Sequence, residues 1–141
     1  MRFLLGVCLA GVLLACGTVG SVDGPVVEGN VTGGGNDALV SGTVIIEGDC
    51  IYLHDPRIDS RYPVVWPHRT SWNPAESAIK LPDGTLVHHG DEVSGGGGYH
   101  TQNLDTYIVP EGMARALNCV DNKHGEIAVF NSDTDIETTQ P

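Results

Sequence analysis

The amino-acid sequence predicts a small all-β fold, a barrel or sandwich of about six to seven short strands with one short helix. Between residues 38 and 130 the apolar runs are short and rich in β-branched and aromatic side chains, a composition typical of strands. Turn signals such as Pro82-Asp83-Gly84 separate these runs. Only the segment 110–118, PEGMARALN, has a helical pattern, and it starts with a proline suited to the first turn of a helix.

The strands are expected in a regular succession along the chain. The runs 77–81 and 85–89 flank Pro82-Asp83-Gly84 and predict a hairpin. The strand count and the single helix before the last strand are OB-like, which is an analogy with small barrels of that type. In chain order, the candidate strands are 39–46, 50–54, 62–67, 77–81, 85–89, 92–95, 106–109 and 126–130.

The first residues, MRFLLGVCLAGVLLACG, have the pattern of an export signal. One basic residue, Arg2, precedes an uncharged apolar run that ends at Ala15. As a helix this run would rise only about 20 Å, less than the roughly 30 Å of a bilayer core. The sequence Leu-Leu-Ala-Cys at 13–16 resembles the bacterial lipobox. The resemblance implies a lipoprotein signal peptide at 1–15 and acyl chains, palmitate among them, on Cys16.

An ordinary signal peptide that is cut near Ala15, with Cys16 incidental, is the alternative. The lipoprotein interpretation predicts an extracytoplasmic protein held on the membrane by its N-terminal acyl chains, since two or more chains anchor stably. Gly17, in place of an aspartate, favours the outer membrane if the cell is Gram-negative. After the anchor we expect a flexible, glycine-rich tether that extends to residue 37, a β-barrel domain at 38–130 and a polar C-terminal tail at 131–141.

The charge of the chain excludes one class of partner. The sequence has 18 acidic and 7 basic residues, and the loss of Arg2 with the signal leaves a mature charge of −12. An acidic surface repels phosphate backbones, so nucleic-acid binding is disfavoured. It also repels anionic lipid, so membrane attachment depends on acylation.

The cysteines predict one disulfide. Cys8 leaves with the signal and Cys16 takes lipid, which leaves Cys50 and Cys119. An even pair in a small exported domain indicates a disulfide, here one that closes a long loop. Two free thiols, or a metal site with nearby histidines, are the alternatives.

The stretch HHGDEVSGGGGYH at 88–100 has three possible interpretations. A phosphate-binding loop is disfavoured because no Lys-Ser/Thr and no clear helix follow the glycines. A divalent-metal site would need His89, Asp91 and His100 to converge, yet no known metal-ligand spacing supports it. The glycines are explained by a bulge, a barrel bend or the close approach of another backbone.

The stretch YPVVWPHRTSWNP at 62–74 predicts a ligand-binding surface. Trp66 and Trp72 would form an aromatic platform, with His68 and Arg69 as polar groups and Tyr99 contributed from the glycine-rich stretch. The alternative is that Trp66 fills the barrel and Trp72 caps its end.

No catalytic motif is present, so the sequence predicts a binding module and not an enzyme, with no cofactor. The expected ligand is an envelope glycan or protein. A divalent-cation binder and a small envelope hydrolase using Asp91 or Glu92 are the rival hypotheses.

About half of the chain resembles small exported lipoproteins of bacteria, especially of actinobacterial type. The resemblance lies in GDCIYL at 48–53, VVWP at 64–67, LPDG at 81–84, and GDEV at 90–93 with the glycine run. It implies an exported β domain with a disulfide, and it brings no catalytic residues.

Overall fold

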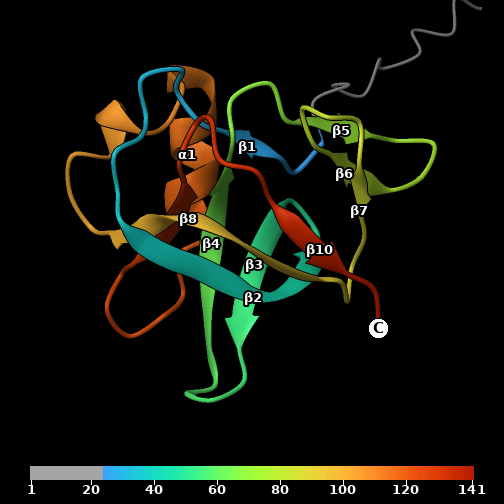
Figure 1. The fold of residues 1–141 in the computed structure, drawn as a ribbon. Coiled ribbons are helices and arrows are strands. Elements are labelled where there is room, and N and C mark those ends of the chain that lie inside the picture. Colours follow the sequence, from blue (N-terminus) through green and yellow to red (C-terminus); the bar gives the residue numbers. More distant parts are fainter. Residues whose placement is uncertain (1–23) are drawn as a thin grey trace, which may run out of the picture.

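The computed structural model describes residues 24–141, in which five strands close on themselves into a barrel (Figure 1). The barrel strands are β2 (Ala38–Glu47), β3 (Cys50–Asp55), β4 (Ser60–Trp66), β8 (Glu92–His100) and β9 (Ile127–Phe130). Around the barrel the order is β2, β3, β4, β9, β8 and back to β2. All neighbours are antiparallel except β4 and β9, which are parallel. The prediction of an all-β small barrel with one short helix is therefore confirmed.

The remaining elements decorate this barrel. A small sheet of β5 (Ser71–Asn73), β6 (Ala78–Lys80) and β7 (Leu86–Val87) is inserted between β4 and β8. Helix α1 (Pro110–Asn118) lies between β8 and β9, at the residues predicted for it. Strands β1 (Val27–Glu28) and β10 (Glu137–Thr139) pair with β4 and β8 respectively. The five barrel strands form a Greek-key arrangement of the OB-like kind.

Strand β2 bends because it serves two sides of the barrel. Its first half pairs with β8 and its second half with β3. Gly42 lies where the two halves meet, and a Cβ there would come within 2.9 Å of the His54 carbonyl oxygen. A side chain at this position would therefore push β3 away from β2.

The glycine run is part of β8, which continues to His100 and does not end at residue 95 as predicted. A Cβ on Gly97 would lie 2.0 Å from the Val129 carbonyl oxygen and 2.9 Å from the Val40 side chain. Of the explanations offered for the glycines, the close approach of another backbone is confirmed. The glycines let β2, β8 and β9 meet at the point where the barrel closes.

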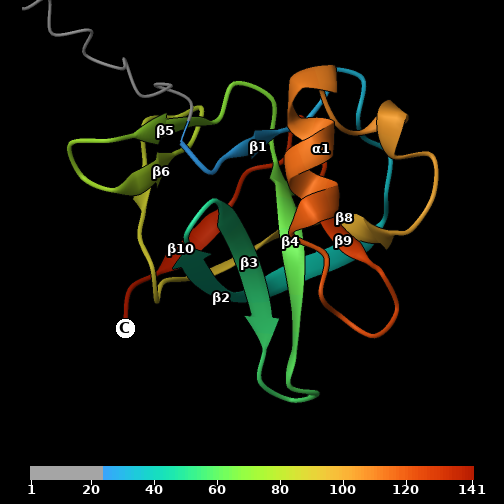
Figure 2. The ribbon, with the colours of Figure 1, turned by 180° about the vertical axis from the view of Figure 1, so that it is seen from behind.

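Two apolar clusters hold the structure together. The barrel interior is filled by side chains from all five strands, and Trp66 and Phe130 lie at its centre with their rings 5.5 Å apart. The second cluster lies outside the barrel, where Ala116 of α1 packs with Val65 of β4 and Val129 of β9. Figure 2 shows the helix beside these two strands. The predicted disulfide joins Cys50 at the start of β3 to Cys119 at the end of α1, and so fixes the helix to the barrel.

Three predicted segments differ from the structure. The tether was expected to reach residue 37, yet Val26 and Val27 are buried and form part of the two cores. The tail at 131–141 contains β10, which pairs with three residues of β8. The expected strand 106–109 is instead a 3₁₀ turn at Leu104–Thr106, followed by a single bridge between Ile108 and Gly29.

The signal peptide at 1–15 and the lipidation site Cys16 lie outside the described residues. Within residues 24–141, no helix combines the length and the apolar character that crossing a membrane requires.

Candidate functional site

The predicted ligand surface is divided among three separate grooves and the core. Trp66 is fully buried inside the barrel, so the expectation that it contacts a ligand is wrong and its core alternative is right. His68 and Arg69 line one groove, Trp72 a second and Tyr99 a third. The five residues therefore do not form one site, because the strands that carry them reach different sides of the barrel.

The groove with Tyr99 is the largest of the three, with a volume of about 690 Å³. We call it the tyrosine groove. It lies between the β3–β4 hairpin and the outer side of β2, β8 and β10. It is lined by Leu39, Ser41, Gly42, Thr43, Asp55, Pro56, Arg57, Tyr62, Glu92, Val93, Ser94, Tyr99, Glu126, Glu137 and Thr139.

The two tyrosines of this groove support each other. The rings of Tyr62 and Tyr99 meet edge to face, with their centroids 4.9 Å apart. Tyr62 is buried, whereas Tyr99 keeps 36% of its surface exposed. Partial burial raises the pKa of Tyr99, so the hydroxyl stays protonated and able to donate a hydrogen bond. Tyr99 thus offers a partly exposed aromatic ring that packs against the buried ring of Tyr62.

The hairpin wall of the groove carries a fixed ion pair. Arg57 donates from Nε and from Nη2 to the two carboxylate oxygens of Asp55, at 3.0 and 2.7 Å. The Arg57 backbone N–H donates to the same carboxylate, at 2.9 Å. The hydrogen bonds from Arg57 lower the pKa of Asp55, so the pair stays charged on both sides over the neutral range. The outcome is a planar, two-pronged polar edge beside the aromatic ring.

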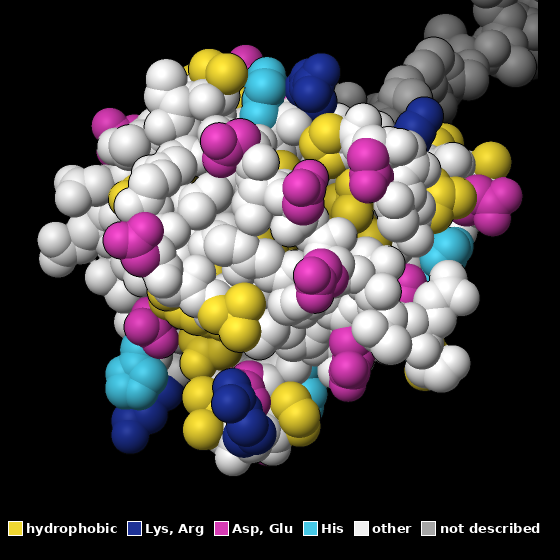
Figure 3. Space-filling view, in the orientation of Figure 1, with side chains coloured by type: hydrophobic (Ala, Val, Ile, Leu, Met, Phe, Trp, Pro, Cys, Tyr) yellow, Lys and Arg dark blue, Asp and Glu magenta, His cyan; other side chains and the backbone are white. Residues whose placement is uncertain are grey.

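The other walls of the groove supply hydroxyl groups and carboxylates. Ser41 and Thr43 of β2 lie opposite Ser94 and Glu92 of β8, so these four side chains share the outer face of the sheet. Glu137 on β10 lies opposite Ser94. The space-filling view shows acidic side chains dispersed over this face of the molecule, with few basic ones (Figure 3).

The two other grooves are smaller, at about 570 Å³ each. The proline groove, which contains His68 and Arg69, is lined by Val31, Pro67, His68, Arg69, Leu81, Pro82, Asp83 and Ser132, Asp133, Thr134, Asp135 and Ile136. The helix groove, which contains Trp72, lies at the start of α1. It is lined by Val26, Glu28, Thr70, Ser71, Trp72, Val109, Glu111, Gly112 and Arg115.

Glu28 separates these two smaller grooves. Its Oε1 accepts a hydrogen bond from the Arg69 backbone N–H at 2.8 Å and lies 2.9 Å from Nδ1 of His68. Arg69 adopts a left-handed backbone conformation there, with φ of 69°. The predicted polar pair His68 and Arg69 is therefore engaged in holding β1 to the β4–β5 loop.

The proposed metal ligands His89, Asp91 and His100 do not come together. His89 and Asp91 precede β8, whereas His100 is its last residue, so the length of a nine-residue strand separates them. Across the described part of the chain, no group of three or more His, Cys, Asp or Glu side chains is placed to hold a metal ion. The structure therefore corrects this assignment.

His89 and Asp91 have structural contacts instead. Asp91 is 4% exposed, and its carboxylate accepts a hydrogen bond from the His88 backbone N–H at 2.8 Å. His89 accepts at Nδ1 from the Ile46 backbone N–H at 3.0 Å. Gly90 between them has φ of 94° and makes the turn. The HHGD segment is thus a tight connection between β7 and β8 that is fastened to β2.

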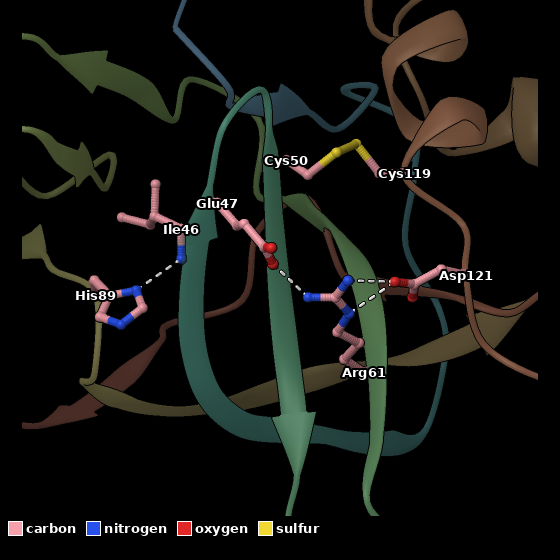
Figure 4. A network of polar contacts seen from close by, with 7 residues as sticks. All are labelled: Ile46, Glu47, Cys50, Arg61, His89, Cys119 and Asp121. Carbon is pink, nitrogen blue, oxygen red and sulfur yellow. Dashed lines mark hydrogen bonds and ion pairs between the residues drawn. A yellow bond between two sulfur atoms is a disulfide. The ribbon is translucent and has the colours of Figure 1, made fainter.

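Arg61 forms a polar cluster on the outer face of β3 and β4 (Figure 4). It bonds to Glu47, and its Nε donates to Asp121 at 2.8 Å. Its guanidinium also lies 4.2 Å from the centre of the Tyr52 ring. With the Cys50–Cys119 disulfide, these contacts fasten the segment after α1 to the β2–β3 connection.

Comparison with known proteins found no match for this chain. No family model, no curated protein and no solved structure matches the chain.

Three important residues of the tyrosine groove were missed from the sequence: Tyr62, Asp55 and Arg57. Tyr62 was assigned to a strand face together with Trp66, and the Asp55–Arg57 pair was part of a loop. The signal that was available is the sequence Asp-Pro-Arg at 55–57, since an aspartate two residues before an arginine in a turn favours a local ion pair.

Proposed function

We propose that the protein is a lipid-anchored, extracytoplasmic binding module that holds an envelope glycan in the tyrosine groove. The anchor is Cys16, which the lipobox marks for acylation. The glycan contacts the exposed ring of Tyr99 and the polar edge made by Asp55 and Arg57.

One observation carries this proposal: a supported aromatic ring lies beside a fixed, planar polar pair in an open groove. Sugar rings have apolar C–H faces that pack on aromatic rings, and equatorial hydroxyl groups that pair with bidentate groups. The Asp55–Arg57 pair is already ordered by its own hydrogen bonds, so little side-chain entropy is lost when a hydroxyl group binds. The hydroxyls of Ser41, Thr43 and Ser94 extend the polar wall along the groove.

Two further considerations support the glycan over other ligands. OB-like barrels are known hosts for oligosaccharides. The groove is open and contains polar and apolar groups side by side, unlike the enclosed apolar pocket that a lipid or a drug-sized molecule occupies.

The test is calorimetric titration of the purified mature protein with chitin oligosaccharides and with soluble peptidoglycan fragments. Removing the ring in Tyr99→Ala is expected to weaken binding at least tenfold, about 1.4 kcal/mol, because the sugar face loses its packing partner. Arg57→Ala is expected to weaken it similarly, because it also releases Asp55.

Trp72→Phe is the matched control, since it alters an aromatic side chain in a different groove. Equal loss in Trp72→Phe, or unchanged binding in Tyr99→Ala, contradicts the location of the site. Absence of binding to every glycan contradicts the function. The recovered oligosaccharides are also sized, because shortened products would favour the rival hypothesis of an envelope hydrolase that uses Asp91 or Glu92. Of these two carboxylates only Glu92 lines the groove, where Glu137 is a further acidic side chain.

A further inference from the structure

The folded domain begins close to the predicted lipid anchor. Gly24, the first residue that the structure describes, packs directly on Trp72, because a Cβ at Gly24 would lie 2.1 Å from the indole ring. Val26 and Val27 then enter the two cores. The expected tether to residue 37 is thus shortened, and only residues 17–23 separate Cys16 from the folded domain.

This short connection limits the height of the domain above the membrane. Eight residue steps join Cys16 to Gly24, and a fully extended chain covers at most about 3.5 Å per step, or about 28 Å in total. A compact domain of this length has a radius of gyration of about 13 Å and is roughly 35 Å across. Gly24 therefore cannot rise a full domain width above the lipid, whatever conformation residues 17–23 adopt.

The two ends of the domain differ in what they contain. Both ribbon views place the β3–β4 hairpin at the end opposite β1 and β5 (Figures 1 and 2). The hairpin forms one wall of the tyrosine groove. We call the opposite end, made of residues 24–28, 69–73, Lys80 and 109–115, the anchor end. To bring the hairpin against the lipid, Gly24 would have to rise farther than the connection reaches.

We propose that the anchor end docks on the lipid surface of the membrane that holds Cys16, and that the tyrosine groove consequently faces away from it. This inference depends on the lipid anchor of the proposed function. The occupant of the helix groove is then the headgroup layer of the bilayer, and the glycan is bound on the far side of the domain.

The chemistry of the anchor end fits a headgroup layer. Val26, Trp72 and Val109 give the helix groove an apolar lining, and tryptophan favours the boundary between lipid and water. Trp72 is half-buried and lines the helix groove, so part of its side chain is accessible there.

The charges at this end are also compatible with lipid. Arg69, Lys80 and Arg115 lie around the start of the domain, and within residues 24–141 none of the three forms an ion pair. Arg115 also donates from Nη1 to the Val26 carbonyl oxygen at 3.3 Å, whereas the exposed side chains of Arg69 and Lys80 are long enough to reach lipid phosphates from an apolar surface. The nearby carboxylates are Glu28, Glu76, Asp83 and Glu111. This end is therefore nearly neutral, whereas the chain carries −11 overall, so anionic lipid repels it least.

The chain supplies its own probes for a test, since it has two tryptophans and Trp66 is fully buried. The mature lipidated protein is reconstituted in vesicles of phosphatidylcholine and phosphatidylglycerol that carry brominated lipids, which quench tryptophan on contact. We expect quenching of the wild type and its loss in Trp72→Phe, which retains only Trp66. Ile58→Trp added to Trp72→Phe places a reporter at the tip of the β3–β4 hairpin, where Ile58 is 64% exposed, and it is expected to stay unquenched.

The outcomes separate the two proposals. Protein that does not float with the vesicles contradicts the lipid anchor itself. Protein that floats with Trp72 unquenched, or with Ile58→Trp quenched as strongly as Trp72, overturns the orientation and leaves the anchor standing. Loss of Trp72 quenching as the protein density on the vesicle increases also overturns the orientation. In that case a second copy of the protein, and not lipid, covers the anchor end. A long Gly-Ser spacer inserted after Gly17 is the matched control, and it is expected to abolish the difference between the two reporters.

Discussion

At the scale of single residues, His100 is the histidine with the most unusual environment. Its ring stacks on that of Tyr107 with the centroids 4.2 Å apart, and its Nε2 is buried without a hydrogen-bond partner among the described residues. Desolvation by burial lowers the pKa of His100 below its usual value. The imidazole is therefore neutral in the folded protein at pH 7, and its stacking on Tyr107 indicates a packing role.

This environment predicts a dependence of stability on pH. Because the folded pKa lies below the unfolded value of about 6.5, the unfolded state binds a proton first as the pH falls. The contribution of His100 is thus complete above about pH 6.5 and is lost as the pH falls from there through the folded pKa. Urea unfolding of His100→Gln at several pH values is expected to give a smaller loss of stability in this window than the wild type.

His124→Gln is the control for this measurement, since His124 is exposed in the loop before β9. It is expected to follow the wild type at every pH. An identical pH profile for His100→Gln and the wild type contradicts the assignment of this titration to His100.

At the scale of elements, the glycines of strand β8 differ in how much space their surroundings leave for a side chain. Gly97 faces the barrel interior and touches the backbone of β9, whereas Gly96 faces outward toward the side chains of Asn131 and Thr134. A methyl group at Gly97 has no space, because a backbone carbonyl blocks it at 2.0 Å. At Gly96 the neighbours are side-chain ends 3.2 and 3.4 Å away, which can move.

The adjacent glycines therefore form a matched pair for a packing test. Gly97→Ala is expected to lower the free energy of unfolding by about 3 kcal/mol, since overpacking a closed core shifts the backbone. Gly96→Ala is expected to cost less than about 1 kcal/mol. Urea denaturation of both variants measures the difference, and equal losses would show that the closure of the barrel does not depend on Gly97.

The elements also show what the sequence could predict. Helix α1 was predicted from its helical pattern and the proline at its first position, and the central strands from short apolar runs rich in β-branched and aromatic residues. The Pro82-Asp83-Gly84 turn was predicted because these residue types favour turns. Strands β1 and β10 were missed because two or three residues have no measurable period, so only pairing with β4 and β8 makes them strands. The tyrosine groove was missed for a related reason: Tyr62 and Tyr99 are distant in sequence and meet only when the barrel closes.

At the scale of the whole molecule, one covalent bond joins the two apolar clusters. Cys50 begins β3, whose side chains fill the barrel, and Cys119 directly follows α1, which covers the outer cluster. The disulfide spans 69 positions of sequence. It therefore restricts most of the domain in the unfolded state.

Removal of this disulfide is expected to lower the free energy of unfolding of the entire domain. A double Cys50→Ala, Cys119→Ala variant is expected to lose about 4 kcal/mol of unfolding free energy in the chain-entropy account of a loop of this length. With reductant present, the wild type is expected to unfold at the same urea midpoint as the double variant, which has no disulfide to reduce. A midpoint that is unchanged by both treatments would contradict a stabilising role of the disulfide.

Closure of the barrel has a consequence for how copies of the protein behave beside one another. A cylinder of five mutually paired strands offers no continuous row of free amide and carbonyl groups to a neighbouring chain. Within residues 24–141, the strands left at sheet margins are β1, β5, β7 and β10, each of two or three residues. Such short margins are poor templates for another polypeptide, so neighbouring copies are not expected to adhere to each other through their sheets, even when they are crowded together.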